Sequence, residues 1–290
     1  LAVFAPIVSV QAETLEEALI MTYNTNPSIH AQRASVRRVD EGVSQALSGW
    51  RPTVTLVGEG GSTYTKSSTT KAGGDKTSNP TSLSLSASQE LYSGGQTVAE
   101  TKSAEADVLA AREGLLSVEQ SIFSAAVSAY MSVVGDKSVV ELNQNNVEVL
   151  TRQLEAANDR FSVGEITRTD VAQAEARLAG AKANLVTSIG SLKVSEATYE
   201  KVVGQKPGEV GYPAYPDNFP ESLGSAIELG IANNPDVKSA KYVEESSKHA
   251  IRATSGKLLP SISLDGRLTQ SNDQSSSSQW SQGAAVSATL

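Results

Sequence analysis

The sequence contains no cysteine, only two histidines and few aromatic residues. Without cysteine the chain can form no disulfide, no thiolate nucleophile, no iron–sulfur cluster and no cysteine-ligated zinc site. His30 and His249 are too few for a histidine-rich metal site or catalytic centre, so we predict no catalytic residues, no metal and no cofactor. Aromatic residues make up 5% of the 290 positions and apolar residues 39%, which is low for one globular core. This composition favours a structural or transport protein over an enzyme.

Basic residues and long apolar runs are also scarce. The chain has 24 Lys and Arg against 32 Asp and Glu, and the resulting formal charge of −8 argues against a nucleic-acid partner. No run of about 18 apolar residues follows the first ten positions, so we expect no transmembrane helix.

Residues 1–12 are predicted to be the remnant of a secretory signal peptide. Leu1–Val10 is a short apolar stretch, and Ala12 is the small residue expected before the cleavage point. A short buried strand is the alternative, but Pro6 would interrupt it. The last eight residues, GAAVSATL, have the pattern of an interrupted strand, so we expect the natural chain to continue.

An internal repeat organises the sequence. The segment that begins at Leu15 recurs 208 residues later, from Leu223, and the match runs without a gap as far as Gly58 and Gly266. Proline and glycine stay in register over this whole length, which indicates duplication of a subdomain and not a solenoid of short units. The first members of the identical pairs are Leu15, Ala18, Asn26, Pro27, Pro52, Leu56 and Gly58.

The repeat divides the chain into a complete unit at residues 13–221 and the start of a second at 222–290. By the repeat length, roughly 130 residues of the second unit are expected beyond this sequence. The predicted elements are helices at 13–48 and 222–257, a β-hairpin at 53–92, a long helical hairpin at 96–203, and strands at 260–290.

Strands are predicted where apolar residues alternate with Ser and Thr. The apolar members of these strands include Val54, Leu56, Leu83, Leu85, Ile262 and Leu264. Polar, Gly- and Ser-rich loops are expected at 66–80 and 270–282. A strand of about ten residues with one apolar and one hydroxyl-rich face suits a membrane β-barrel with a wet lumen. A hairpin on a soluble sandwich fits the same alternation, and the signal peptide and composition favour the membrane.

A long helix is predicted from 96 to about 162, because this stretch lacks proline and repeats apolar residues at heptad spacing. Val163-Gly164 should break it, and a return helix should run from about 170 to 203, capped by Thr167 or Thr169. The two helices would form a hairpin that packs side by side with other helices. The heptad positions are Leu109, Leu116, Phe123 and Tyr130 and, after a three-residue slip, Val133, Val140, Val147, Leu154 and Phe161.

Two strands from each repeat are too few to close a barrel, because small single-chain barrels have about eight. Open sheet edges are not tolerated in lipid. Several chains must therefore share one barrel, and their helices would continue it as a cylinder on one side of the membrane.

The order of these elements and their motifs resembles the TolC family of outer-membrane efflux and secretion channels. The motifs are Leu-Tyr-Ser-Gly-Gly at 91–95, Arg-Phe-Ser-Val-Gly-Glu-Ile-Thr-Arg-Thr-Asp-Val at 160–171, and the repeated Asn234-Pro235 and Leu259-Pro260. The resemblance implies an α+β membrane protein, in which long α-helical hairpins form a tunnel and transmembrane strands contribute to a 12-stranded β-barrel shared by a homotrimer. It also implies a place in the bacterial outer membrane, in contact with lipid, with the tunnel in the periplasm.

The resemblance further implies a function and partners. The trimer would be the exit duct of a tripartite efflux pump or a type I secretion system, joined through a periplasmic adaptor protein to an inner-membrane pump or ABC transporter. Val163, Gly164 and Glu165 match the tip that adaptors grip, with Glu165 where the family has leucine. Thr169 and Asp170 match a pair that latches the closed entrance.

Simpler interpretations accompany these assignments. Gly164 is also what any helical hairpin turn needs, and Thr169 and Asp170 are also what a helix start needs. The rival hypothesis for the whole chain is a periplasmic coiled-coil scaffold or adaptor with a peripheral β domain, which accounts for the helices and predicts no membrane strands.

Overall fold

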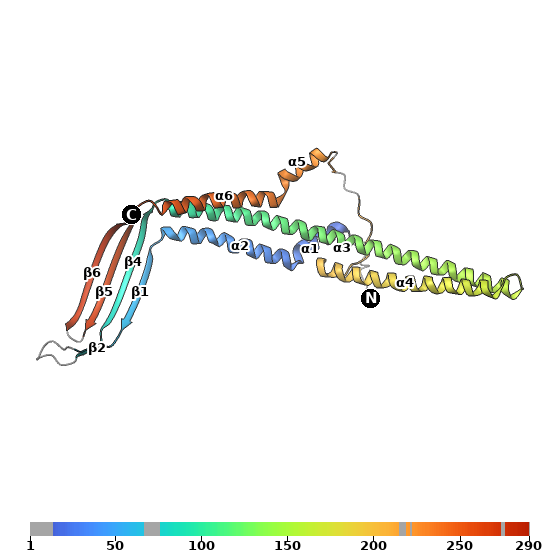
Figure 1. Cartoon of the computed structure of the whole chain (residues 1–290), viewed down its shortest axis with the longest axis horizontal. Helices are drawn as coiled ribbons and strands as arrows, with labels where there is room; N and C mark the ends of the chain where they lie inside the picture. The colour runs from blue at the N-terminus through green and yellow to red at the C-terminus, as the bar shows by residue number, and fades with distance from the viewer. Residues whose placement is uncertain (1–13, 67–75, 215–218, 221, 274–275, 290) are drawn as a thin grey trace, which may run out of the picture. The chain divides into compact units, whose positions relative to one another are not determined.

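The computed structural model combines long antiparallel helices with antiparallel sheet, which confirms the α+β class (Figure 1). The structure describes residues 14–66, 76–214, 219–220, 222–273 and 276–289. The signal-peptide remnant predicted at 1–12 lies outside them.

The helices are α1 (Leu15–Thr25), α2 (Pro27–Leu47), α3 (Gln96–Ser162), α4 (Arg168–Val203), α5 (Leu223–Asn233) and α6 (Pro235–Gly256), with a short 3-10 turn, η1 (Ser48–Trp50). The strands are β1 (Thr53–Gly60), β2 (Thr63–Thr65), β3 (Lys76–Ser78), β4 (Thr81–Ser93), β5 (Ser261–Asp273) and β6 (Ser276–Thr289). In the described part of the chain, no helix has an apolar stretch long enough to cross a bilayer.

Helices α1 and α5 have the same local design, 208 residues apart. Each has 11 residues and follows a hydroxyl N-cap, Thr14 or Ser222, whose side chain accepts a hydrogen bond from the backbone N–H three residues on. Each ends at an asparagine, Asn26 or Asn234, that precedes proline. Proline disfavours helical geometry in the residue before it and suits the first position of the next helix, so these motifs set the helix boundaries.

The chain divides into two compact units, each of which is described by itself. The first unit comprises residues 1–34 and 115–234. Its core joins α1, α3 and α4, with the rings of Tyr130 and Tyr199 6.4 Å apart between centroids. Half of the other residues of the buried cluster are alanines, which allow the helix backbones to approach closely. The buried cluster consists of Ala18, Ala126, Ala129, Tyr130, Val133, Val134, Tyr199 and Val203.

Polar contacts tie the break between α1 and α2 to the end of α4. The Thr25 hydroxyl donates to the Val203 carbonyl at 2.8 Å, and the Asn26 amide donates to the Val202 carbonyl at 2.9 Å. The last carbonyls of a helix have no partner within it, so these side chains satisfy groups that would otherwise stay unpaired.

The second unit comprises residues 35–114 and 235–290. Here α6 packs on the first part of α3 through small residues: the Ser103 hydroxyl donates to the Ser246 carbonyl at 3.1 Å, and the Ser239 hydroxyl donates to the Ala110 carbonyl at 3.1 Å. Gly94, between β4 and α3, has a φ of +60°, and a Cβ added there would lie 2.3 Å from the carbonyl oxygen of Gly256. The junction between β4 and α3 therefore packs against the end of α6, with no space for a side chain at Gly94.

The main sheet of this unit has four antiparallel strands in the order β1-β4-β5-β6, and they lie side by side in Figure 1. Each repeat supplies one hairpin, and the pairing of β4 with β5 joins the two hairpins into one sheet. A bulge between Glu90 and Tyr92 shifts the register of β4 against β5. A small two-stranded sheet, β2 with β3, extends from the first hairpin.

One prediction about local structure is wrong. The predicted loop at 270–282 is largely strand, because β5 continues to Asp273 and β6 begins at Ser276. Ladder hydrogen bonds come from the backbone, so a register set by the apolar part continues through a run of Ser and Gln. The heptad positions stay a prediction: in the single chain Tyr130 and Val133 are buried, while Leu109 and Leu116 are 39% and 46% exposed.

Candidate functional site: an amphipathic sheet and a hairpin tip

The six apolar strand residues predicted from the sequence lie on one face of the four-stranded sheet. Alternate residues of a strand point to opposite faces, and the register places Leu56 opposite Leu85, and Leu264 opposite Val286. Leu56 is 65% exposed although it is apolar. An exposed apolar face of this kind is unusual for a water-facing sheet, and lipid is the environment that suits it.

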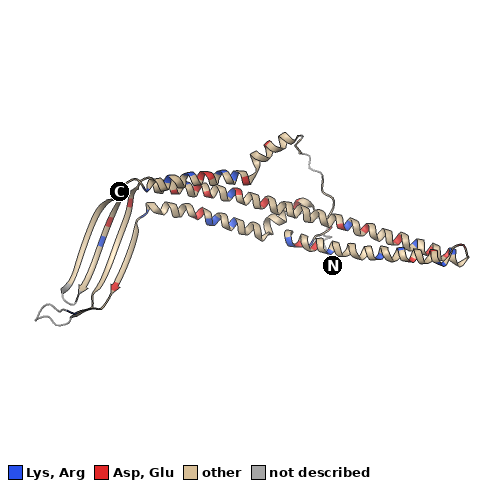
Figure 2. Cartoon of the chain, in the orientation of Figure 1, with Lys and Arg blue, Asp and Glu red and all other residues tan. Residues whose placement is uncertain are grey.

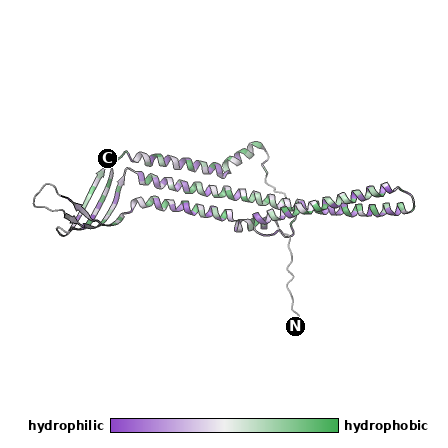
Figure 3. Ribbon diagram, turned by 60° about the horizontal axis from the view of Figure 1, so that its bottom comes forward, coloured by the Kyte–Doolittle hydropathy of each residue, from purple (hydrophilic) through white to green (hydrophobic). Residues whose placement is uncertain are grey.

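By the register, the opposite face of the sheet is rich in hydroxyl groups and carries Glu59, Asp265 and Arg267. Figure 2 shows how few charged residues the strands carry, and Figure 3 shows that hydrophilic and hydrophobic residues occur together along them. Ser88 donates to the Asp265 carboxylate at 2.7 Å and Ser263 donates to it at 2.9 Å, so the carboxylate is held by strands β4 and β5. Ser84 and Thr269 share a hydrogen bond of 3.2 Å between the same strands. Such a surface is compatible with water.

The tip of the helical hairpin is a tight turn at the end of α3. Gly164 has a φ of +83°, a region that glycine adopts without strain. Its N–H donates to the Phe161 carbonyl at 2.9 Å, and the Glu165 N–H donates to the Arg160 carbonyl at 2.9 Å. This pair of bonds is the Schellman motif that ends many helices, so Gly164 has the structural role of a turn glycine.

Side chains at the tip are open to solvent. Val163 is 77% exposed, which is a high value for an apolar residue. Next to it the Arg160 guanidinium donates to the Glu165 carboxylate at 2.7 Å. This hydrogen bond and the positive charge lower the pKa of Glu165 below its ordinary value. The tip therefore presents one apolar side chain beside an ion pair.

Helix α4 begins at a capping box that uses Thr167 and not Thr169. The Thr167 hydroxyl accepts from the Asp170 N–H at 3.4 Å, and the Asp170 carboxylate accepts from the Thr167 N–H at 2.9 Å and from its hydroxyl at 2.8 Å. These hydrogen bonds to Thr167 lower the pKa of Asp170 below its ordinary value. Asp170 thus stabilises the first turn of α4, whatever further role it has.

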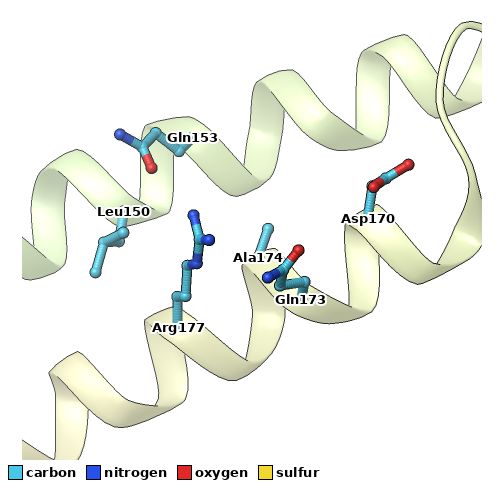
Figure 4. A pocket seen from close by; sticks show the side chains of 6 residues that line it. All are labelled: Leu150, Gln153, Asp170, Gln173, Ala174 and Arg177. Carbon is cyan, nitrogen blue, oxygen red and sulfur yellow. The ribbon is translucent and has the colours of Figure 1, made fainter.

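A small cavity of about 60 Å³ lies between α3 and α4 near the tip (Figure 4). Of the lining residues, Asp170 lies nearest to the turn, and Arg177 projects from α4 toward α3. The lining of the cavity is polar apart from Leu150 and Ala174, and it contains no arrangement of nucleophile and base. The lining residues are Leu150, Gln153, Asp170, Gln173, Ala174 and Arg177.

The structure brings the predicted strand residues together on one face, and the tip residues Val163, Gly164 and Glu165 together in one turn. Sequence reasoning missed Arg160, whose pairing with Glu165 closes the turn. The signal was available, because opposite charges five residues apart flank the turn glycine. It also missed Arg177, which no pattern in the sequence distinguishes from other helix-surface arginines.

An amphipathic antiparallel sheet joined to a long helical hairpin defines a class of proteins: those that line a passage through a membrane and extend it on one side. The chain belongs to the outer membrane efflux protein family, whose sequence pattern matches residues 21–205. This confirms the resemblance found in the sequence, and it places the protein in the outer membrane.

The chain is also similar to individual outer membrane proteins. The chain is 35% identical over 259 residues to the outer membrane efflux protein BepC of Brucella suis, a match covering 89% of this chain and 55% of BepC. It is 25% identical over 283 residues to the outer membrane protein TolC of Escherichia coli, covering 95% of this chain and 55% of TolC. The chain thus spans about half the length of these relatives.

Solved structures share the fold. The CmeC outer membrane channel of Campylobacter jejuni superposes with a TM-score of 0.77 at 15% identity, covering 94% of this chain and 61% of CmeC. The outer-membrane channel OprN superposes with a TM-score of 0.73 at 19% identity, covering 94% of this chain and 63% of OprN. At such identities the likeness concerns the fold alone.

Proposed function

We propose that the full-length protein is the outer-membrane exit duct of a tripartite efflux pump or type I secretion system. It conducts small molecules or unfolded proteins passively from a periplasmic pump complex to the exterior, and it is not an enzyme. The observation that carries this proposal is the four-stranded sheet, whose exposed apolar face suits lipid and whose hydroxyl-rich face suits a watery lumen.

The two outer edges of the sheet support a homotrimer. In the part of the chain that the structure describes, β1 pairs only with β4 and β6 only with β5. Unpaired backbone groups are costly in lipid, so both edges need partner strands. Three copies of a four-stranded sheet give the 12 strands expected from the family resemblance, and the alternating strand directions allow β6 of one copy to pair antiparallel with β1 of the next.

The hairpin tip is the proposed docking site for the periplasmic adaptor protein, which connects the duct to an inner-membrane pump or ABC transporter. Val163 is the side chain best suited to this contact, because it is apolar and exposed at the point of the turn. Gly164 shapes the turn, and Glu165 adds a charge that Arg160 holds in place.

Thr169 and Asp170 are the proposed entrance latch. In the full-length channel, Asp170→Ala should raise the conductance of the closed state if its carboxylate also contacts another part of the entrance. Thr167→Ala is the matched control, because it also weakens the capping box, by removing both hydrogen bonds of the Thr167 hydroxyl, while the Asp170 charge remains. Equal conductance in Asp170→Ala and the parent protein would leave Asp170 with its capping role alone.

The proposal is tested by fractionating cells that express the full-length protein and by measuring the purified protein in detergent and in planar lipid bilayers. We expect recovery in the outer-membrane fraction, the mass of a trimer, and discrete conductance steps. Recovery as a soluble periplasmic protein without conductance would contradict the proposal and favour the coiled-coil scaffold.

A further inference from the structure

The internal repeat continues beyond Gly58 and Gly266, into the second strand of each hairpin. Strand β6 repeats β4, with Leu85, Ser86, Ala87 and Ser88 corresponding to Val286, Ser287, Ala288 and Thr289. The spacing here is 201 residues and not 208, because the connection between the strands is seven residues shorter in the second hairpin.

The observed register agrees with this alignment. Leu56 lies opposite Leu85 in the first hairpin, and Leu264 lies opposite Val286 in the second. Leu264 is the repeat equivalent of Leu56, and Val286 is that of Leu85. The two hairpins therefore pair their strands in the same register, although the sequences of β4 and β6 differ.

The pairing of β4 with β5 is the junction between the first and the second repeat. Across it Ser86 lies opposite Arg267, and Ala87 lies opposite Gly266. If copies close into a ring, the junction between β6 of one copy and β1 of the next joins a second repeat to a first repeat. The same geometry is expected there, because the two hairpins have the same internal register.

We infer that β6 pairs with β1 of a second copy of this chain in a defined register, in which Ser287 lies opposite Glu59 of the partner subunit and Ala288 lies opposite Gly58 of the partner subunit. This inference rests on the proposed homotrimer and goes beyond it by naming the residues at the seam.

The residues at the seam are those that the internal junction uses. On the apolar face, Ala opposite Gly occurs inside the chain and recurs between copies. On the polar face, Ser lies opposite a charged residue in both places, Arg267 inside the chain and Glu59 of the partner subunit between copies. Within the chain, a Cβ added to Gly58 would make only an ordinary contact, 3.8 Å from Leu83, so the internal packing does not explain this glycine.

Disulfide cross-linking of the full-length protein tests the register. The 290 residues of this sequence contain no cysteine that would interfere. Residues directly opposite in antiparallel strands have Cα atoms about 4.5–5.5 Å apart, within the range that a disulfide spans. A shift of two residues keeps the same face but separates the Cα atoms by about 8 Å, too far for a bridge.

Two double variants probe the seam: Glu59→Cys with Ser287→Cys on the polar face, and Gly58→Cys with Ala288→Cys on the apolar face. Oxidation should give covalent dimers and trimers on a non-reducing gel, with at least one pair linking most of the protein. The matched control, Ser86→Cys with Arg267→Cys, has the same geometry inside one chain and should form a disulfide without covalent oligomers.

The shifted pair, Val57→Cys with Ser287→Cys, should cross-link at least tenfold less. Cross-linking of the shifted pair in place of the matched pairs would overturn the register. Absence of any oligomeric cross-link while the internal control forms its disulfide would overturn it as well. The mass of the parent protein in detergent separates this failure from failure of the proposed function, because a monomer would contradict the trimer itself.

Discussion

The four-stranded sheet and the hairpin tip both expose apolar side chains, but they do so in different ways. On the sheet the exposed residues form a continuous face that spans four strands, with Leu56 and Leu85 in direct apposition. At the tip a single valine, Val163, stands beside an ion pair. A broad apolar face matches a continuous apolar solvent, whereas one valine within charged surroundings matches a small contact with another protein.

The largest difference is expected between Gly94, which follows the last residue of β4, and Gly164, in the turn at the tip. Gly94→Ala should lower the free energy of unfolding by about 2–5 kcal/mol, because the new methyl group meets the Gly256 carbonyl and the residue must keep a positive φ. Gly164→Ala should cost only about 1–2 kcal/mol, because nothing lies within 4 Å of the new Cβ. Denaturant unfolding of the two variants measures the difference, and equal costs would contradict it.

Charge should distinguish the two faces of the sheet. Leu85→Arg on the apolar face should lower the stability of the protein in lipid vesicles by about 2–4 kcal/mol near the membrane centre. Ser84→Arg is the matched control on the opposite face, next to it in the same strand, and should change the stability little. The free energy of folding into vesicles measures both variants. A cost for Ser84→Arg as large as that for Leu85→Arg would count against a watery lumen.

Near the tip, the start of α4 should depend on Thr167. Thr167→Ala should cost about 1 kcal/mol locally, because it removes the N-cap hydroxyl. Thr169→Ala should leave the helix start unchanged, since Thr169 is exposed and lies one residue inside the helix. Hydrogen exchange of the first amides of α4 reports the difference. Faster exchange in Thr169→Ala than in Thr167→Ala would show that the cap is assigned to the wrong threonine.

Acid should loosen the tip while leaving the uncharged contacts of the sheet in place. The pKa values of Glu165 and Asp170 are lower in the folded protein than in the unfolded chain, because Arg160 and Thr167 donate hydrogen bonds to them. Their contribution to stability is therefore complete at neutral pH and is lost as the pH falls below about 4 and through the folded pKa values. Amide exchange around the turn at pH 7 and pH 3 measures the loss, and Arg160→Gln should reduce it.

The smallest effect on stability is expected at Val163. Because this side chain is 77% exposed, Val163→Ser should leave the unfolding temperature of the full-length protein unchanged. It should nevertheless weaken capture of a periplasmic adaptor protein by the immobilised channel. Val149→Ser, at an exposed valine of α3 away from the turn, is the matched control. Equal capture by both variants and the parent protein would remove Val163 from the docking site.

Sequence reasoning recovered those parts of the fold that local chemistry determines. Asn26-Pro27 and Asn234-Pro235 mark helix boundaries because proline restricts its neighbour, and Gly164 marks the turn because a positive φ is needed there. The strand faces were equally accessible, since alternation of Leu and Ser along β4 defines them.

What the sequence could not provide depends on contacts between distant segments. The strand character of residues 270–273 and 276–282 comes from backbone pairing and not from side-chain pattern. The burial of Ala110 beside the exposed Leu109 comes from the packing of α6 on this part of α3. Sequence also left the cap of α4 open between Thr167 and Thr169, because both are hydroxyl residues at a suitable distance from the turn.

The most direct test of the central claim is the environment of the two faces of β5 in the full-length protein in lipid vesicles. Single cysteines at Ser263, Leu264, Arg267 and Leu268 can be labelled with a fluorophore and exposed to a quencher attached to lipid chains. We predict strong quenching at Leu264 and Leu268, weak quenching at Ser263 and Arg267, and the reverse order for reaction with a water-soluble thiol reagent. Equal quenching and equal reactivity at all four positions would contradict a sheet with one face in lipid and the other in water.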